Sequence, residues 1–243
     1  MKNNYKILLF NFGYARGWDG SLKSFFKTFH RLPFQFFSQR KKELEKLKKI
    51  IDREKPDLIL ISEIESKKCK NFIENLGYFF NDMSVKYGEK SLYRKIPAWH
   101  NNSNAFFSKE KIDFEKLYFS EGAKKLIYKL KLPFQNTTLF FAHFSLVDKT
   151  RKRQIKEIDK MSKKFSSKII AGDFNLLTGL NELDEIIQKN NFKLSSKDFT
   201  YPSYKPQKAF DLFLISANLK FKTKILKNEK FSDHLPVILE VEK

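Results

Sequence analysis

Apolar runs of strand length recur along this chain, and polar or amphipathic segments separate them. The runs at 5–12 and 57–61 are typical of buried strands. Between them, leucine and isoleucine recur at helical spacing among lysine and glutamate over 39–54, which predicts an amphipathic helix. A further helix is predicted over 66–76, so strand and helix alternate in the first third of the chain.

The rest of the chain is richer in strand patterns. A run of them spans the middle of the sequence, and strand and helix alternate again afterwards. This order indicates two sheets packed face to face with helices outside. The predicted strands are 78–81, 101–108, 117–119, 126–132, 137–143, 169–171, 210–215, 221–226 and 235–242, and the predicted helices are 149–165 and 181–189.

The segment 21–37 is unusual because it carries six phenylalanines. It is either a helix and connector packed on the core or an exposed apolar surface. We expect it to pack on the core, because large exposed apolar patches are uncommon on monomeric proteins.

The stretch 168–177, KIIAGDFNLL, combines a buried strand with candidate chemistry. Gly172 interrupts the apolar run, and Asp173 and Asn175 follow at the carboxyl end of the strand. An ionised carboxylate can accept a proton and an amide can hold an oxygen, which suits water attacking a phosphate. The same residues would suit an ordinary Asx turn, so this stretch alone leaves both interpretations open.

Other polar side chains occupy comparable places at or beside the ends of apolar strands. Singly, each has a structural explanation, such as capping the turn that follows the strand. Asp211 is the one acidic residue in an otherwise apolar strand and therefore needs a partner. The recurrence of such residues at equivalent positions favours a common site, and they are Asn11, Glu63, His143, Asp211, Asp233 and His234.

Seven short motifs together resemble a known family. In chain order they are FNFG, ISEIES, SNAFFS, AHFSL, GDFN, AFDLFLIS and SDHLPV. Their order resembles that in the endonuclease/exonuclease/phosphatase superfamily of DNase I-like and exonuclease III-like enzymes, over residues 7–240. The resemblance implies one catalytic domain over 1–243 and a four-layer α/β sandwich of two mixed sheets. It also implies phosphoester hydrolysis that depends on Mg²⁺, with Mn²⁺ as the alternative ion.

The resemblance further implies a metal site. Glu63 would be the principal metal ligand, Asn11 would assist it, and Asp233 would lie close to the metal. Carboxylate and amide oxygens suit Mg²⁺ better than Zn²⁺, which prefers more nitrogen or sulfur. The single cysteine, Cys69, gives no metal cluster and excludes an internal disulfide.

The same resemblance gives catalytic roles to the remaining residues. Asp173 would orient or deprotonate the attacking water, and Asn175 would hold the phosphate. His143 would stabilise the negative phosphoryl oxygens. His234 would pair with the carboxylate of Asp211, which fixes the tautomer of the imidazole and favours its protonated form.

The charge balance favours a polyanionic partner. The formal net charge of +20 would attract nucleic acid, anionic membranes or phosphorylated small molecules. Only 7 of the 48 basic residues are arginine, and an AT-rich genome would over-supply lysine, so we expect part of this charge to reflect composition rather than function. We expect a nucleic-acid substrate, DNA rather than RNA, and an endonuclease.

Two alternatives compete with DNA hydrolysis. The stretches GYARGWDGS, HFSLVDKTRKRQI and TYPSYKP resemble those of bacterial family members associated with phospholipid metabolism, and 21–37 would then contact an anionic membrane lipid. A non-enzymatic nucleic-acid-binding protein on this scaffold would lack a catalytic residue, and none is missing. Without a targeting segment or an apolar run of membrane-span length, we expect a cytoplasmic monomer.

Overall fold

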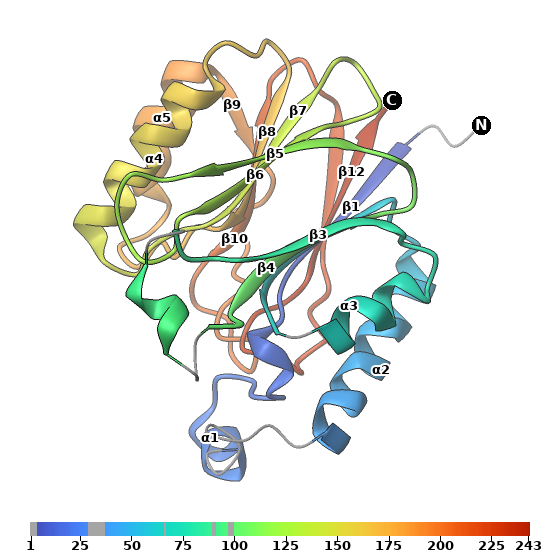
Figure 1. Ribbon diagram of the computed structural model, residues 1–243. Coiled ribbons are helices and arrows are strands. Elements are labelled where there is room, and N and C mark those ends of the chain that lie inside the picture. The colour runs from blue at the N-terminus through green and yellow to red at the C-terminus, as the bar shows by residue number, and fades with distance from the viewer. Residues whose placement is uncertain (1–3, 29–36, 66, 89–90, 97–99) are drawn as a thin grey trace.

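Two β-sheets stacked face to face form the centre of the molecule, and helices cover both outer sides (Figure 1). The computed structural model describes residues 4–28, 37–65, 67–88, 91–96 and 100–243. Apolar side chains join α2 and α3 to one sheet and α4 and α5 to the other. The expected four-layer α/β sandwich is therefore confirmed.

The helices correspond closely to the predicted ones. The predicted ranges 39–54, 66–76, 149–165 and 181–189 match α2 (Phe37–Glu54), α3 (Lys67–Glu74), α4 (Asp148–Ser162) and α5 (Asp184–Asn190). Short 3-10 helices also occur at η1 (Gly13–Ala15), η3 (Leu92–Lys95) and η4 (Leu180–Leu183). No helix in the described part of the chain combines the length and the hydropathy of a membrane span.

Strands from both ends of the chain form the first sheet. Its order is β11-β12-β1-β2-β4-β3, in which β1 and β2 are parallel and the other neighbours are antiparallel. The strands are β1 (Asn4–Asn11), β2 (Leu58–Ile64), β3 (Phe80–Val85), β4 (Ser103–Ser108), β11 (Phe221–Ile225) and β12 (Val237–Glu242).

The second sheet is also mixed. Its order is β5-β6-β7-β8-β10-β9, in which only β7 and β8 are parallel neighbours. The strands are β5 (Asp113–Tyr118), β6 (Leu126–Lys131), β7 (Thr138–His143), β8 (Lys168–Asp173), β9 (Phe192–Leu194) and β10 (Asp211–Ser216).

Alternation along the central strands divides their side chains between two cores. Leu9 of β1 and Ala171 of β8 face the space between the sheets, whereas Leu8 and Ile170 pack toward the outer helices. Successive side chains of a strand point to opposite faces. The continuous apolar runs in the sequence are therefore explained by burial on both faces of each central strand.

Three strands differ from the predicted ranges. β3 lies at Phe80–Val85 rather than 78–81, β5 lies at Asp113–Tyr118 rather than 117–119, and β9 was not expected. All three are edge strands of their sheets, and nearly all of their side chains are partly or largely exposed. Exposed edge strands carry polar and charged residues, which hide the apolar alternation in the sequence.

The phenylalanine-rich segment 21–37 is only partly described. Its helix α1 (Leu22–Thr28) lies at one end of the sandwich, at the bottom of Figure 1. Leu22 is 77% exposed and Phe26 is 75% exposed, so the expectation that this segment packs on the core is wrong for these two side chains. The helix is held instead by Phe25, whose ring centroid lies 6.0 Å from that of Trp18. Residues 29–36 lie outside the described residues.

Candidate functional site

Three polar side chains lie side by side at one end of the second sheet. His143 at the end of β7 pairs with Asp173 at the end of β8, and Asp173 pairs with Asp211 at the start of β10. Each continues the alternation that faces the first sheet, so the three side chains point into the space between the sheets. Each is only 1% exposed, so the apolar stripe of the core ends in a buried polar cluster.

Glu63 reaches this cluster through an irregularity in β2. Strict alternation would place its side chain toward the outer helices, beside those of Ile59 and Ile61. A register shift follows Ile61, and the φ of Glu63 is +55°, a left-handed conformation that is uncommon outside glycine. Such bulges redirect a side chain and are frequent beside active sites. The carboxylate consequently lies within electrostatic reach of His143 and His234.

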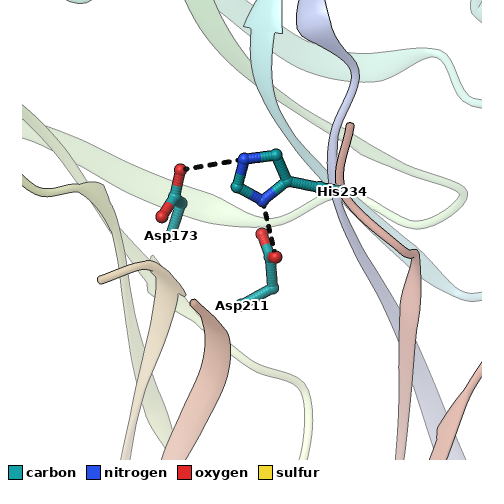
Figure 2. A group of neighbouring side chains, drawn as sticks. All are labelled: Asp173, Asp211 and His234. Carbon is teal, nitrogen blue, oxygen red and sulfur yellow. Dashed lines mark hydrogen bonds and ion pairs between the residues drawn. The ribbon is translucent and has the colours of Figure 1, made fainter. Parts of the chain in front are cut away.

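His234 connects the carboxylates of Asp173 and Asp211, which come from different strands (Figure 2). It also lies beside the amide of Asn11. Its Nδ1 lies 2.7 Å from Asp211 Oδ2, and its Nε2 lies 3.9 Å from Asp173 Oδ2. Asn11 Nδ2 donates to the same Asp173 oxygen at 3.0 Å and lies 3.4 Å from His234 Nε2. Because Asn11 ends β1 and His234 precedes β12, this network joins the two sheets.

The network favours a positively charged His234. Burial opposes protonation, but the carboxylates of Asp211 and Asp173 outweigh it and raise the pKa of the imidazole to about 10. Burial would also raise the pKa of Asp173, but His143 and His234 lower it below its usual range. For Asp211, burial prevails over His234 and raises the pKa. At neutral pH the arrangement is therefore an imidazolium between two carboxyl groups, with its Nδ1–H donating to Asp211.

His143 has the opposite electrostatic character. Its Nε2 lies 3.2 Å from Asp173 Oδ2 and contacts Nζ of Lys124. Burial, followed by the Lys124 ammonium, lowers the pKa of His143 to about 4, so the ring is neutral at pH 7. Burial and repulsion from Lys86 also lower the pKa of Lys124, to about 8. His143 can therefore offer a hydrogen bond, whereas Lys124 supplies the charge.

Asn175 is held beside Asp173 by the turn that follows β8. Its backbone N–H donates to Asp173 Oδ1 at 3.0 Å, which forms an Asx turn, and its Nδ2 donates to the carbonyl oxygen of Phe144 at 2.9 Å. Its φ of +51° is a conformation that asparagine tolerates. The two interpretations of this stretch are therefore compatible, because Asp173 makes the turn through Oδ1 and joins the cluster through Oδ2.

Two lysines at the site were not singled out from the sequence. Lys86, directly after β3, donates to Glu63 Oε1 at 3.2 Å and to the hydroxyl of Tyr14. Lys124 lies just before β6 and contacts His143. Lys86 follows a strand and Lys124 precedes one. Nothing in their sequence positions distinguishes these two from the other lysines of this chain.

Glu63 and Asp233 form the oxygen site best suited to a divalent metal ion. Burial and repulsion from Glu63 raise the pKa of Asp233 to about 6. Burial also opposes ionisation of Glu63, but Lys86 and nearby cationic groups outweigh it and lower its pKa to about 2. These two partly buried carboxylates provide hard oxygen ligands of the kind that Mg²⁺ prefers, and a bound cation would favour the ionised form of both.

Gly13 holds the amide oxygen of Asn11 and lies against Asp233. The Gly13 N–H donates to Asn11 Oδ1 at 3.1 Å. A Cβ at position 13 would lie 3.2 Å from Asp233 Oδ1 and 3.1 Å from Ser232 Oγ, and the φ there is +52°. The absence of a side chain at this position therefore leaves room next to the carboxylate, so Asn11, Glu63 and Asp233 fit the metal site expected from the sequence.

The group Asp173, Asp211 and His234 is a poorer metal site, although its ligand atoms lie within 4.8 Å of one another. Metal ligation requires a neutral imidazole nitrogen, and the pKa of His234 is raised to about 10. Both ring nitrogens also face carboxylates already. The buried Oδ1 of Asp211 has no hydrogen-bond partner among the described residues, which fits a group that titrates within a network.

The structure brings all the predicted site residues to one end of the sandwich. The first sheet and its loops contribute one half, and the second sheet contributes the other. The residues are Asn11, Glu63, His143, Asp173, Asn175, Asp211, Asp233 and His234. Their individual roles stay predictions.

Comparison with known proteins identifies the fold. No protein-family model matches this sequence, and no curated protein matches it significantly. Among solved structures, an endonuclease/exonuclease/phosphatase from Beutenbergia cavernae has a TM-score of 0.71 at 12% identity and covers 99% of this chain and 72% of its own. The human Nocturnin catalytic domain with bound sulfate gives 0.69 at 15% identity, covering 100% and 95%. A Bacteroides thetaiotaomicron mannosyl-6-phosphatase gives 0.65 at 16% identity, covering 98% and 100%.

This chain therefore has the fold of the endonuclease/exonuclease/phosphatase structures, as its motifs indicated. The similarity extends over nearly its full length. The names of the similar structures range from endonuclease/exonuclease/phosphatase to mannosyl-6-phosphatase, so the fold alone does not decide the reaction or the substrate, and both are argued from the site.

Proposed function

We propose that this protein is a phosphodiester hydrolase that depends on a divalent metal ion, Mg²⁺ first and Mn²⁺ second. The observation that carries the proposal is the buried network of Asp173, Asp211 and His234 beside the carboxylates of Glu63 and Asp233. Burying so many ionisable groups is unfavourable for folding. Groups with strongly perturbed pKa values gathered at one place are typical of active sites.

Asp173 would orient the attacking water. Its lowered pKa keeps it an acceptor at neutral pH, and Asn11 fixes its Oδ2 oxygen. As the water oxygen bonds to phosphorus, a water proton passes toward Asp173. The ester P–O bond breaks, and the leaving oxygen keeps the electron pair and takes a proton from solvent. Protonated His234 would stabilise the negative charge that develops on the phosphoryl oxygens.

The surrounding residues would complete the site. Glu63, Asp233 and the amide oxygen of Asn11 would hold the metal ion, which when bound neutralises charge on the phosphoryl group. His143 and the Asn175 amide would position the phosphate by hydrogen bonding. The similar Nocturnin domain was solved with a bound sulfate anion, which is compatible with oxyanion binding by a protein of this fold.

The net charge of +20 makes DNA the first candidate substrate, and a membrane phospholipid is the second. The direct test is incubation of the purified protein with plasmid DNA, RNA, sphingomyelin, phosphatidylinositol phosphates and bis-p-nitrophenyl phosphate. Each substrate is tested with Mg²⁺, with Mn²⁺ and with EDTA. We expect hydrolysis of at least one diester with metal and none with EDTA. Lack of turnover of every substrate under all metal conditions would reject the proposal.

A further inference from the structure

Exposed apolar side chains gather at the end of the sandwich that holds the site. α1 follows Asn11 of β1, η3 lies between β3 and β4, the loop at 144–147 follows His143, and the segment 195–210 precedes Asp211. Each of these connections exposes at least one large apolar side chain. We call six of them the apolar rim: Leu22, Phe26, Leu92, Leu146, Val147 and Phe199.

Hydrogen bonds hold the loop at 144–147, which carries two residues of the apolar rim, in place. Arg151 of α4 is fully buried, and its Nη1 donates to the carbonyl oxygens of Ser145 at 3.2 Å and Leu146 at 3.0 Å. Its Nε donates to Glu182 at 2.7 Å. The loop is therefore fixed from inside while Val147 remains 63% exposed. Apolar side chains that are fixed outward in this way indicate a surface to which they bind.

Exposed lysines accompany the rim. A lysine stands within two positions of a rim residue on three different connections. The pairs are Leu22 with Lys23, Val147 with Lys149, and Phe199 with Lys197. Apolar side chains that can insert between lipids, flanked by lysines that attract anionic headgroups, are the combination used by interfacial membrane-binding proteins.

We propose that the apolar rim and its lysines dock this protein on an anionic phospholipid bilayer, with the site facing the membrane. The rim residues come from separate connections around the site, which suits a flat, deformable surface better than a compact partner. Duplex DNA offers phosphates and polar groove edges, so it would use the lysines but would gain little from exposed Leu22 or Phe26. A soluble substrate would not require exposed apolar side chains around the site.

The proposal rests on the proposed function for its chemistry. The net charge alone places DNA first, but the apolar rim favours the second candidate, a phospholipid that carries a phosphodiester headgroup. Docking would hold the headgroup at the end of the sandwich where Asp173 and His234 lie. Docking itself does not depend on hydrolysis, so the two can be tested separately.

The test is sedimentation of the full chain with vesicles in EDTA, which prevents metal-dependent turnover. We expect binding to phosphatidylcholine vesicles that contain phosphatidylserine, and weaker binding to phosphatidylcholine alone. The double variants Leu22→Ser/Phe26→Ser and Leu146→Ser/Val147→Ser should each reduce the partition coefficient on the order of 10-fold or more, because each removes two inserting side chains. Thermal melting of both variants confirms that they fold.

The matched control is Phe79→Ser. Phe79 is 69% exposed but lies before β3, at the opposite end of the sandwich. This variant should bind vesicles as the unmodified protein does. Equal loss in the control and the rim variants, or no binding to anionic vesicles, would overturn the docking proposal.

Two further measurements separate the remaining outcomes. Rim variants that lose affinity for duplex DNA or become monomeric from a dimer, while vesicle binding is unchanged, would assign the rim to another partner and overturn the proposal. Vesicle binding by a protein that hydrolyses none of the tested DNA, RNA, lipid or synthetic substrates with Mg²⁺ or Mn²⁺ would support docking and reject the proposed function. Hydrolysis of bis-p-nitrophenyl phosphate without vesicle binding would support the proposed function and reject docking.

Discussion

The two ends of the sandwich are built from the same strands but differ in which side chains they bury and which they expose. At the site end, ionisable side chains such as Asp173 and His234 are buried, while apolar side chains such as Leu22 are exposed. At the other end, short connections such as 132–137 and 217–220 join one strand to the next. Phe79 is exposed at the other end too, but among the described residues there it is not accompanied by a cluster of buried ionisable groups such as Asp173 and His234. Buried charge and exposed apolar surface both cost stability, so their coincidence at the site end favours a functional role for that end.

The largest effect should come from breaking the pair of Asp211 and His234. We expect Asp211→Asn and His234→Ala each to lower kcat on bis-p-nitrophenyl phosphate by ~10²–10⁴-fold, because each removes the charged imidazole network. The double variant should be little slower than either single variant, since residues that act as a unit are not additive. Steady-state kinetics of the three variants measures this. Multiplicative losses would show that the two residues act independently.

Mg²⁺ binding should depend on Glu63 but not on the nearby Glu65. Glu63→Gln removes a charged oxygen ligand and should weaken Mg²⁺ binding by at least ~10-fold in titration calorimetry. Glu65→Gln is the matched control, because Glu65 lies two residues further on and faces Arg40 at 3.5 Å. Unchanged Mg²⁺ affinity in Glu63→Gln, or an equal loss in Glu65→Gln, would contradict the assignment of Glu63.

The two buried histidines should give opposite pH dependences of stability. The pKa of His234 is raised from 6.5 to about 10, so its contribution is complete below pH 6.5 and is lost as the pH rises toward 10. The pKa of His143 is lowered from 6.5 to about 4, so its contribution is complete above pH 6.5 and is lost as the pH falls toward 4.

Urea unfolding in EDTA, followed across this range, checks the assignment. His234→Asn should flatten the alkaline decline and His143→Asn should flatten the acidic one, by a few kcal/mol each. If the change of unfolding free energy with pH is the same after a histidine is removed, that pH dependence belongs to another group.

The sequence predicted the site residues from their places at or beside the ends of apolar strands and from the family motifs. Asn11, His143, Asp173 and Asp211 each end or begin such a strand, and in the structure they alternate in phase with residues that face the inner core. A place at a strand end is local information, so it can be taken from the sequence. The pairing of β7 with β8 and of β8 with β10 then brings three of these four together.

The missed features depend on contacts between distant segments. The register shift in β2 that redirects Glu63 arises from its pairing with β4, which local spacing does not encode. Lys86 and Lys124 matter because they contact Glu63 and His143, which lie far from them in the sequence, and the many lysines of this chain conceal them. Exposure of Leu22 and Phe26 could not be inferred either, since an amphipathic or aromatic pattern does not say what covers it.

The smallest effect is expected at the opposite end. Phe79→Ser should leave the rate of diester hydrolysis unchanged and alter the free energy of unfolding by no more than about 0.5 kcal/mol, as is usual for exposed positions away from special features. Kinetics and urea unfolding of this variant measure both. A clear loss of activity would mean that the two ends are coupled.

The central claim is that Asp173 and its network perform metal-dependent phosphodiester hydrolysis. The measurement that tests it most directly is the rate of bis-p-nitrophenyl phosphate hydrolysis by the unmodified protein and by Asp173→Asn, each with Mg²⁺ and with EDTA. Asp113→Asn, an exposed carboxylate at the start of β5, serves as the control. We predict turnover only with Mg²⁺, a loss of ~10²–10⁴-fold in Asp173→Asn and no loss in the control. Turnover that persists in EDTA, or that survives in folded Asp173→Asn, would contradict it.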